Sequence, residues 1–156
     1  MSRAPFQVIV LPFRRAAGVY EFAAFRRSDA DYWQGITGGG ENDESPSQAA
    51  VREAKEEAGL GDDQRFVRLD SMCMVPVYHF AARKNWPQNL YAIPEYAFAV
   101  DATGVNLVVS PEHSELTWGS YAGITALLHW DSNKTALWEL NERLTTGQLS
   151  VIQANA

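Results

Sequence analysis

Three glutamates, Glu53, Glu56 and Glu57, are spaced so that they can act on one ligand. Residues i, i+3 and i+4 are neighbours on an α-helix, so the three carboxylates would share one face. Like charges at this spacing repel by roughly a few tenths of a kcal/mol per pair. Mg²⁺ or Mn²⁺ would reverse that penalty, because hard divalent cations take carboxylate and phosphate oxygens as ligands. The spacing therefore predicts either a solvated acidic stripe or a metal site for a phosphate-containing substrate.

The segment that carries these glutamates has clear helix start and stop signals. Ser45 is a suitable N-cap, Pro46 suits the first helical position, and Gln48 completes a capping box. Gly59 can adopt the left-handed conformation that often ends a helix. The arc beside the glutamates is apolar, and we expect it to be buried: Ala50, Val51, Ala54 and Ala58.

The stretch Gly38–Leu60 follows a longer pattern, G-x5-E-x7-R-E-U-x-E-E-x-G-U, where U is aliphatic and x is any residue. Its fixed positions are filled by Gly38, Glu44, Arg52, Glu53, Glu56, Glu57, Gly59 and Leu60. This pattern resembles the signature of the Nudix hydrolases. Ala54 is smaller than the usual residue at its U position, which is a mild departure.

The resemblance implies a metal-dependent hydrolase that cleaves a nucleoside diphosphate linked to another group. It makes Glu56 and Glu57 direct ligands of Mg²⁺ or Mn²⁺, while Glu53 binds metal or takes the proton of the attacking water. Arg52 is implied to orient a glutamate by a charge-assisted hydrogen bond. Glu44 is implied to be an outer metal ligand or a structural partner of that arginine.

The resemblance also implies site residues at both sides of the acidic helix. A backbone carbonyl of the glycine turn, from Thr37 or Gly38, is expected to join the metal shell. Many Nudix sequences have a Glu-His pair several residues before a tryptophan, which here is Trp118. Glu112 is therefore our candidate for a further metal ligand or the catalytic base, and Glu115 is the second choice. The alternative for such a loop glutamate is plain solvent exposure.

Four residues before the signature are candidates for binding substrate. Arg26 or Arg27 can bind phosphate oxygens bidentately, although adjacent arginines also serve as surface solubilisers. Trp33 and Gln34 directly precede the glycine turn. In Nudix proteins an aromatic residue here lies near the nucleotide site, and the alternative is a tryptophan packed beneath the loop.

Segments 25–38, 112–118 and 130–133 are similar to those of bacterial dihydroneopterin triphosphate and dATP pyrophosphohydrolases. This similarity implies a deoxynucleoside or pterin triphosphate as substrate, cleaved to a monophosphate and pyrophosphate. A dinucleoside polyphosphate or a nucleotide sugar is the next choice. A non-catalytic nucleotide sensor is the alternative of a different class, although such proteins have usually lost signature glutamates.

Length and composition predict one domain over residues 1–156, because this length can bury a sizeable core and 46% of the residues are hydrophobic. The resemblance implies that it is a Nudix domain. A net charge of −6 argues against a nucleic-acid partner, and the resemblance implies a small-molecule nucleotide or pterin triphosphate as the partner. Cys73 is the single cysteine, which excludes an internal disulfide and suits a reducing compartment. We find no leader or membrane-spanning pattern, so we expect a cytoplasmic protein.

Hydrophobic patterns outside the acidic helix predict a mixture of strands and helices. Strands are expected at 6–13, 19–25, within 66–77 and at 95–100, with a long loop at 83–94. Helices are expected at 119–129 and from a cap at 131–133 to about Leu144, followed by a tail that is a short strand or a loose end. These patterns alone leave α/β and α+β open, and the resemblance implies an α/β/α sandwich with a mixed β-sheet.

Overall fold

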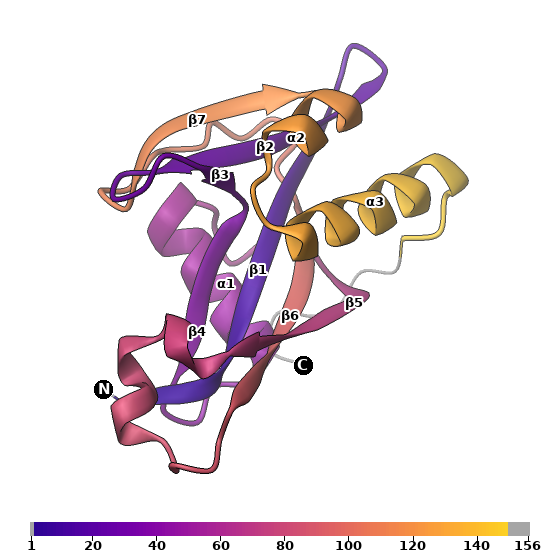
Figure 1. Cartoon of the computed structure of the whole chain (residues 1–156). Helices are drawn as coiled ribbons and strands as arrows, with labels where there is room; N and C mark the ends of the chain where they lie inside the picture. Colours follow the sequence, from indigo (N-terminus) through magenta and orange to yellow (C-terminus); the bar gives the residue numbers. More distant parts are fainter. Residues whose placement is uncertain (1, 150–156) are drawn as a thin grey trace.

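The computed structural model describes residues 2–149, which form a mixed seven-stranded sheet between helices (Figure 1). The strands are β1 (Arg3–Ala16), β2 (Val19–Arg27), β3 (Trp33–Gln34), β4 (Ile36–Glu41), β5 (Phe66–Pro76), β6 (Ala92–Asp101) and β7 (His113–Gly119). The helices are α1 (Pro46–Ala58), α2 (Tyr121–Leu127), α3 (Asp131–Thr146) and two short 3₁₀ helices, η1 (Val77–His79) and η2 (Ala81–Asn85). The predicted fold class is confirmed.

Strand β1 organises the sheet because it pairs with three others. Its first half pairs antiparallel with β4, its second half pairs antiparallel with β2, and β6 runs parallel along it. The two strands expected at 6–13 and 19–25 form a β1–β2 hairpin, with positive φ at Ala17 and Gly18 in its turn. Strand β4 has β1 as its partner within residues 2–149, so its other edge is left for side chains of α1 and the loops.

Two apolar clusters fill the two faces of the sheet, and β1 contributes to both. Val8 and Val10 pack on the α1 side, whereas Ile9 and Leu11 pack on the side of α2 and α3. This alternation is the two-residue period of a strand. The predicted apolar face of α1 is buried through Ala50, Ala54 and Ala58. Within the described chain, no helix is long and apolar enough to cross a membrane.

Helix α1 begins and ends at the predicted residues. The Ser45 hydroxyl accepts the Gln48 backbone N–H, and the Gln48 side chain accepts the Ser45 N–H at 2.8 Å. Gly59 has a φ of 71° and donates its N–H to the Lys55 carbonyl at 3.0 Å. These caps satisfy backbone groups that a helix end leaves unpaired, so the turns that carry the glutamates are held in place.

Helix α3 begins differently from our expectation, and the predicted cap at 131–133 is wrong. The N-cap is Trp130, and it makes no side-chain capping bond. Asn133 is buried instead, and its Oδ1 accepts the backbone N–H of Gly35 at 2.8 Å. This bond satisfies a backbone group far away in the sequence and ties the start of α3 to the β3–β4 junction. Gly147 ends the helix in a left-handed conformation, shortly after the expected end near Leu144.

Other boundaries also move. Segment 66–77 contains one strand, β5, and the predicted loop at 83–94 starts inside η2 and ends inside β6. The helix expected at 119–129 is the shorter α2. The tail prediction concerns residues that mostly lie outside the described chain, because the structure describes none beyond 149.

Candidate active site

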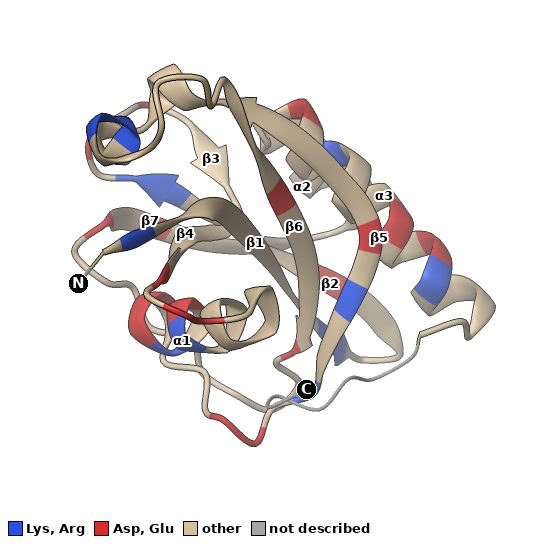
Figure 2. Ribbon diagram, turned by 90° about the horizontal axis from the view of Figure 1, so that it is seen from below, with Lys and Arg blue, Asp and Glu red and all other residues tan. Residues whose placement is uncertain are grey.

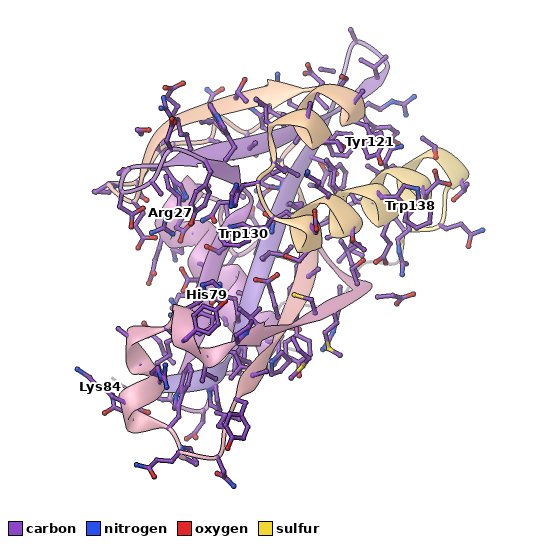
Figure 3. The ribbon with its side chains drawn as sticks, in the orientation of Figure 1. Arg27, His79, Lys84, Tyr121, Trp130 and Trp138 are labelled. Carbon is purple, nitrogen blue, oxygen red and sulfur yellow. The ribbon has the colours of Figure 1, made fainter. Side chains whose placement is uncertain are left out.

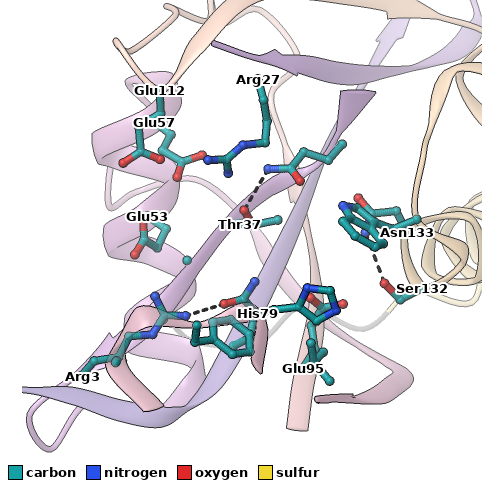
Figure 4. A pocket seen from close by; sticks show the side chains of 18 of the residues that line it. Arg3, Arg27, Thr37, Glu53, Glu57, His79, Glu95, Glu112, Ser132 and Asn133 are labelled. Carbon is teal, nitrogen blue, oxygen red and sulfur yellow. Dashed lines mark hydrogen bonds between the residues drawn. The ribbon is translucent and has the colours of Figure 1, made fainter. Parts of the chain in front are cut away.

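A large pocket lies with the acidic helix α1 and strand β4 on one side and the start of α3 on the other (Figure 4). Strands β1, β2, β3, β5 and β6, the 3₁₀ helices and the loops at 28–32 and 111–112 also contribute to its lining. Acidic residues also gather on α1 in the ribbon coloured by charge (Figure 2). The described lining includes seven carboxylates, Asp29, Glu41, Glu53, Glu57, Glu95, Glu112 and Asp131, and two arginines, Arg3 and Arg27. A polyphosphate needs additional positive charge to bind there.

Glu53 lies against the backbone of β4. A Cβ atom on Gly38 would be 2.0 Å from its Cδ, so glycine is required for this close approach. Glu53 is 9% exposed, and Arg52 Nη1 donates to its Oε1 at 3.0 Å. Burial raises the pKa of Glu53 to about 7, although the Arg52 charge and hydrogen bond act in the opposite direction.

Glu57 is the most buried carboxylate of the site, at 2% exposed. Its Oε2 has no hydrogen-bond partner within residues 2–149. Burial raises the pKa of Glu57 to about 9, and the neighbouring carboxyl group of Glu112 raises it further. Glu112 comes from the loop before β7, so α1 and a distant loop bring their carboxyl groups together (Figure 4).

His113 lies beside Glu57, with its Nδ1 3.8 Å from Glu57 Oε2. Burial lowers the pKa of His113, and its ring packs against Phe25 with centroids 5.2 Å apart. Neither ring nitrogen has a hydrogen-bond partner among the described residues. Our sequence reasoning gave His113 no role by itself, although the Glu-His pair pointed at this position.

Arg52 connects the glutamates around the pocket without lining it in the described structure. Its Nε and Nη2 donate to the two carboxylate oxygens of Glu44 at 2.8 and 3.0 Å. Its Nη1 donates to Glu53 and Glu56, and its Nη2 also donates to the Gly39 carbonyl. Glu44 is thus a partner of the arginine, and Arg52 sets the positions of Glu53 and Glu56.

Glu56 is held by Arg52 at 3.2 Å, its side chain is 58% exposed, and it is not among the described residues of the lining. Over residues 2–149, no three acidic, histidine or cysteine side chains converge as a ready-made cation site. The donor set nevertheless fits a hard divalent cation, because Glu53, Glu57 and Glu112 offer only oxygen and Glu57 Oε2 lacks a partner among the described residues.

The two adjacent arginines point into different surroundings. Arg27 lines the pocket and donates its Nε and Nη2 to Asp29, both at 2.7 Å. Arg26 pairs with Asp31 and Glu115 outside the described lining. Neighbouring residues of a strand project to opposite faces, which explains the difference. Glu115, our second choice for the base, lies with Arg26 rather than with Glu57.

Trp33 and Gln34 also lie in different surroundings. Gln34 is buried, lines the pocket and donates its Nε2 to Thr37 Oγ1 at 3.0 Å. Trp33 packs against the apolar cluster on the α3 side and is absent from the described lining. Thr37 and Gly38 both line the pocket, but they belong to strand β4 and not to a turn. The expected place of one of their backbone carbonyls in a metal shell stays a prediction.

Aromatic rings line the pocket away from Glu57. Tyr32, His79, Phe80 and Trp130 belong to the lining, and His79 and Trp130 meet edge to face at 5.9 Å. Tyr32 also stacks on His129 at 4.6 Å, which fixes the rings at the start of α3. Figure 3 shows Arg27, Trp130 and His79 around the same hollow, whereas Trp138 lies farther along α3.

Arg3 is a pocket residue that sequence reasoning missed. Its Nη2 donates to Gln7 at 2.5 Å, and its guanidinium lies 5.0 Å from the Phe80 ring centroid. A Cβ on Gly39 would be 2.3 Å from Arg3 Nε, which explains why the glycine run continues beyond Gly38. Arg3 Nε has no hydrogen-bond partner among residues 2–149, and burial lowers its pKa. No local motif marked this arginine, because only strand pairing brings it to the pocket.

Comparisons with known proteins agree with this fold and motif. The chain matches the sequence model of the NUDIX domain over residues 5–138. It is 45% identical to a proposed NUDIX hydrolase from Listeria monocytogenes whose crystal structure superposes with a TM-score of 0.88, covering 96% of this chain and 100% of that one. It is also 28% identical over 116 residues to the dihydroneopterin triphosphate diphosphatase of Haemophilus influenzae, 72% of each chain. The Escherichia coli K12 enzyme of that name is 29% identical over 114 residues, 72% of this chain and 76% of that one.

Fold, motif and relatives together define a hydrolase that acts on phosphorus anhydrides. The chain belongs to the NUDIX domain family, in which pyrophosphohydrolases generally use divalent cations.

Proposed function

We propose that this chain is a Mg²⁺- or Mn²⁺-dependent pyrophosphohydrolase of a nucleoside or pterin triphosphate, releasing a monophosphate and pyrophosphate. One observation carries the proposal. Glu53, Glu57, Glu112 and Arg27 converge at one end of a pocket whose other end is lined by aromatic rings. A charged chain and a flat ring joined in one molecule match these two ends.

Glu53, Glu57 and Glu112 would hold the cations, with the Gly38 backbone beside them. Glu56 can join them when its hydrogen bond to Arg52 is exchanged, because it lies on the same helix and is largely exposed. When bound, a divalent cation neutralises phosphate charge and lowers the pKa of a bound water. Because Glu57 Oε2 has no hydrogen-bond partner among residues 2–149, Glu57 is the strongest candidate for a cation ligand.

The other residues bind the phosphates and accept a proton. Arg27 exchanges Asp29 for phosphate oxygens, which a guanidinium binds with paired N–H groups. Water attacks phosphorus, the bridging P–O bond breaks, and the pyrophosphate leaves with the bond's electron pair. Glu53 or Glu112 takes the water proton, and comparing Glu53→Gln with Glu112→Gln over a pH series distinguishes the two bases.

The relatives support a triphosphate with a ring. Two similar proteins are dihydroneopterin triphosphate diphosphatases, and their similarity extends over 72% of this chain. Tyr32, His79 and Trp130 offer flat surfaces on which a base or pterin ring can stack. Because the same pocket has aromatic rings to stack on a base or pterin and carboxylates to hold cations, it suits a triphosphate joined to a ring better than a free phosphate ester.

The test is a panel of dATP, dGTP, dCTP, dihydroneopterin triphosphate, diadenosine tetraphosphate and ADP-ribose with Mg²⁺, with products identified by mass. We expect a triphosphate to give a monophosphate and pyrophosphate with the highest kcat/KM. Faster cleavage of the dinucleoside or sugar compound would replace our substrate class. Tight binding of a triphosphate without any turnover would make the protein a sensor.

A further inference from the structure

Four pocket residues form one row across the sheet. Gly39 on β4 pairs with Gln7 on β1, Gln7 pairs with Glu95 on β6, and Glu95 pairs with Cys73 on β5. Paired residues project to the same face, and neighbouring strands are about 4.8 Å apart. All four residues line the pocket, so this row is its floor. Glu95 on β6 is therefore two strand spacings, roughly 10 Å, from Gly39 on β4.

Glu95 is a buried carboxylate without a cation. It is 8% exposed, and none of the ion pairs within residues 2–149 includes it. Burial raises its pKa, while hydrogen bonds from Ser132, Cys73 and Gln7 favour the ionised form. A buried carboxylate with only neutral donors around it is costly, so further N–H donors from a ligand would stabilise it.

Glu95 also lies away from the phosphate-binding end. Figure 4 shows it below His79 and across the pocket from Glu57 and Glu112. Ser132, next to the aromatic Trp130, faces the same part of the pocket. A ligand with its phosphates near Glu57 would thus bring its ring over the row that contains Glu95.

The shape of a carboxylate restricts which ring edge it can pair with. Its two oxygens accept side by side, which matches an edge with two adjacent donors. A 2-amino-4-oxopyrimidine ring, as in guanine and pterins, presents a ring N–H beside an amino group. Adenine presents an acceptor beside an amino group, so one carboxylate oxygen would face a lone pair.

We propose that Glu95 selects the ring of the substrate by accepting two hydrogen bonds from the 2-amino-4-oxopyrimidine edge of a guanine or pterin triphosphate. This inference rests on the proposed function and specifies its substrate class. Glu95 acts on the ring and takes no part in breaking the anhydride bond.

The test compares wild-type protein with Glu95→Gln on dGTP, dihydroneopterin triphosphate and dATP. A glutamine keeps the shape but offers one acceptor and one donor, which matches adenine. We expect kcat/KM for both 2-amino-4-oxo rings to fall roughly 10- to 100-fold, mostly through KM, with no comparable loss for dATP. The exposed Glu142→Gln on α3 is the matched control and should change nothing. An equal fall for all rings, or wild-type preference for dATP, would overturn the proposal.

A second measurement needs no variant, so it stands even if Glu95→Gln does not fold. dITP differs from dGTP only by the missing 2-amino group, and wild-type protein should use it roughly tenfold less well. Equal kcat/KM for the two would contradict the proposal. The ratio of dGTP to dihydroneopterin triphosphate then separates guanine from pterin.

Binding separates failure of this inference from failure of the proposed function. If no triphosphate is hydrolysed, the proposed function is wrong. Dissociation constants of the α,β-methylene analogues of dGTP and dATP still test Glu95 by calorimetry. We expect the dGTP analogue to bind tighter to wild-type protein and to lose that advantage in Glu95→Gln. An unchanged ratio would contradict ring selection by Glu95.

Discussion

The two ends of the pocket are built in different ways. The acidic end depends on one helix, whose three glutamates follow a local spacing, with Glu112 added from a loop. The ring end is formed by Glu95 of β6, His79 of η1 and Trp130, which directly precedes α3. On the proposed function, the residues for the reaction come mostly from one short segment, whereas those for substrate choice are brought together by long-range pairing. Mutations at the first end should change kcat, and mutations at the second should change KM and ring preference.

The largest effect is expected at the acidic end from Glu57→Gln. Its raised pKa means that the metal-free protein carries a neutral carboxyl group near pH 7, so a neutral amide should fit with little loss of stability. We expect kcat to fall roughly 10²- to 10⁴-fold, in the range of a lost catalytic group, with an almost unchanged Tm. Steady-state kinetics at saturating Mg²⁺ and thermal unfolding check this, beside the Glu142→Gln control. Full activity would remove Glu57 from the site.

Arg27→Gln tests the cation that faces the phosphates. The change removes a charged pair of N–H donors, and we expect kcat/KM to fall roughly 10- to 100-fold for every triphosphate, whatever its ring. Arg65→Gln is the matched control, since Arg65 is exposed and outside the described lining of this pocket. A fall in kcat/KM for only one type of ring would contradict this prediction, because it would place Arg27 at the ring end of the pocket.

Trp130→Leu tests the ring end. Stacking of a base on an aromatic side chain contributes about 1–3 kcal/mol, so we expect KM to rise roughly 5- to 100-fold while kcat changes little. Kinetic titration with dGTP checks this result. Trp138→Leu is the control. Trp138 lies on α3, the helix that begins after Trp130, but it is 54% exposed and not in the described lining of the pocket. A fall in kcat with unchanged KM would show that the two ends are not separable.

The smallest expected effect is the change in thermal stability when a cation binds the folded protein. A cation that binds only the folded protein stabilises it by RT ln(1 + [L]/Kd), about 2.7 kcal/mol at 100 Kd. Mn²⁺ should therefore raise the Tm of wild-type protein by several degrees and that of Glu57→Gln by less. Thermal scans with and without Mn²⁺ measure the difference. Identical shifts in both proteins would locate the cation elsewhere.

The difference between the two ends also explains what the sequence alone predicted. The caps at Ser45 and Gly59 were correct, because helix ends have local signals. The fold class was also correct, but it came from the family resemblance, since the strand and helix patterns alone left α/β and α+β open. The cap at 131–133 was wrong because Asn133 satisfies the distant Gly35 N–H instead. A tertiary partner was stronger there than a local preference.

Most of the ring end was invisible to the same reasoning. Arg3 and Gln7 lie near each other on β1, but Glu95 on β6 is far away in the chain and meets them only through the pairing of these two strands. The choice between Arg26 and Arg27 was open for a related reason, since strand alternation decides it and the sheet's inner face was unknown.

Crystals soaked in Mn²⁺ with an α,β-methylene dGTP analogue test the central claim, that the acidic helix holds cations against a polyphosphate. We predict an anomalous difference peak at the manganese edge between the analogue's phosphates and the carboxylates of Glu53 and Glu57. Well-ordered phosphates with no such peak beside either carboxylate would contradict the account.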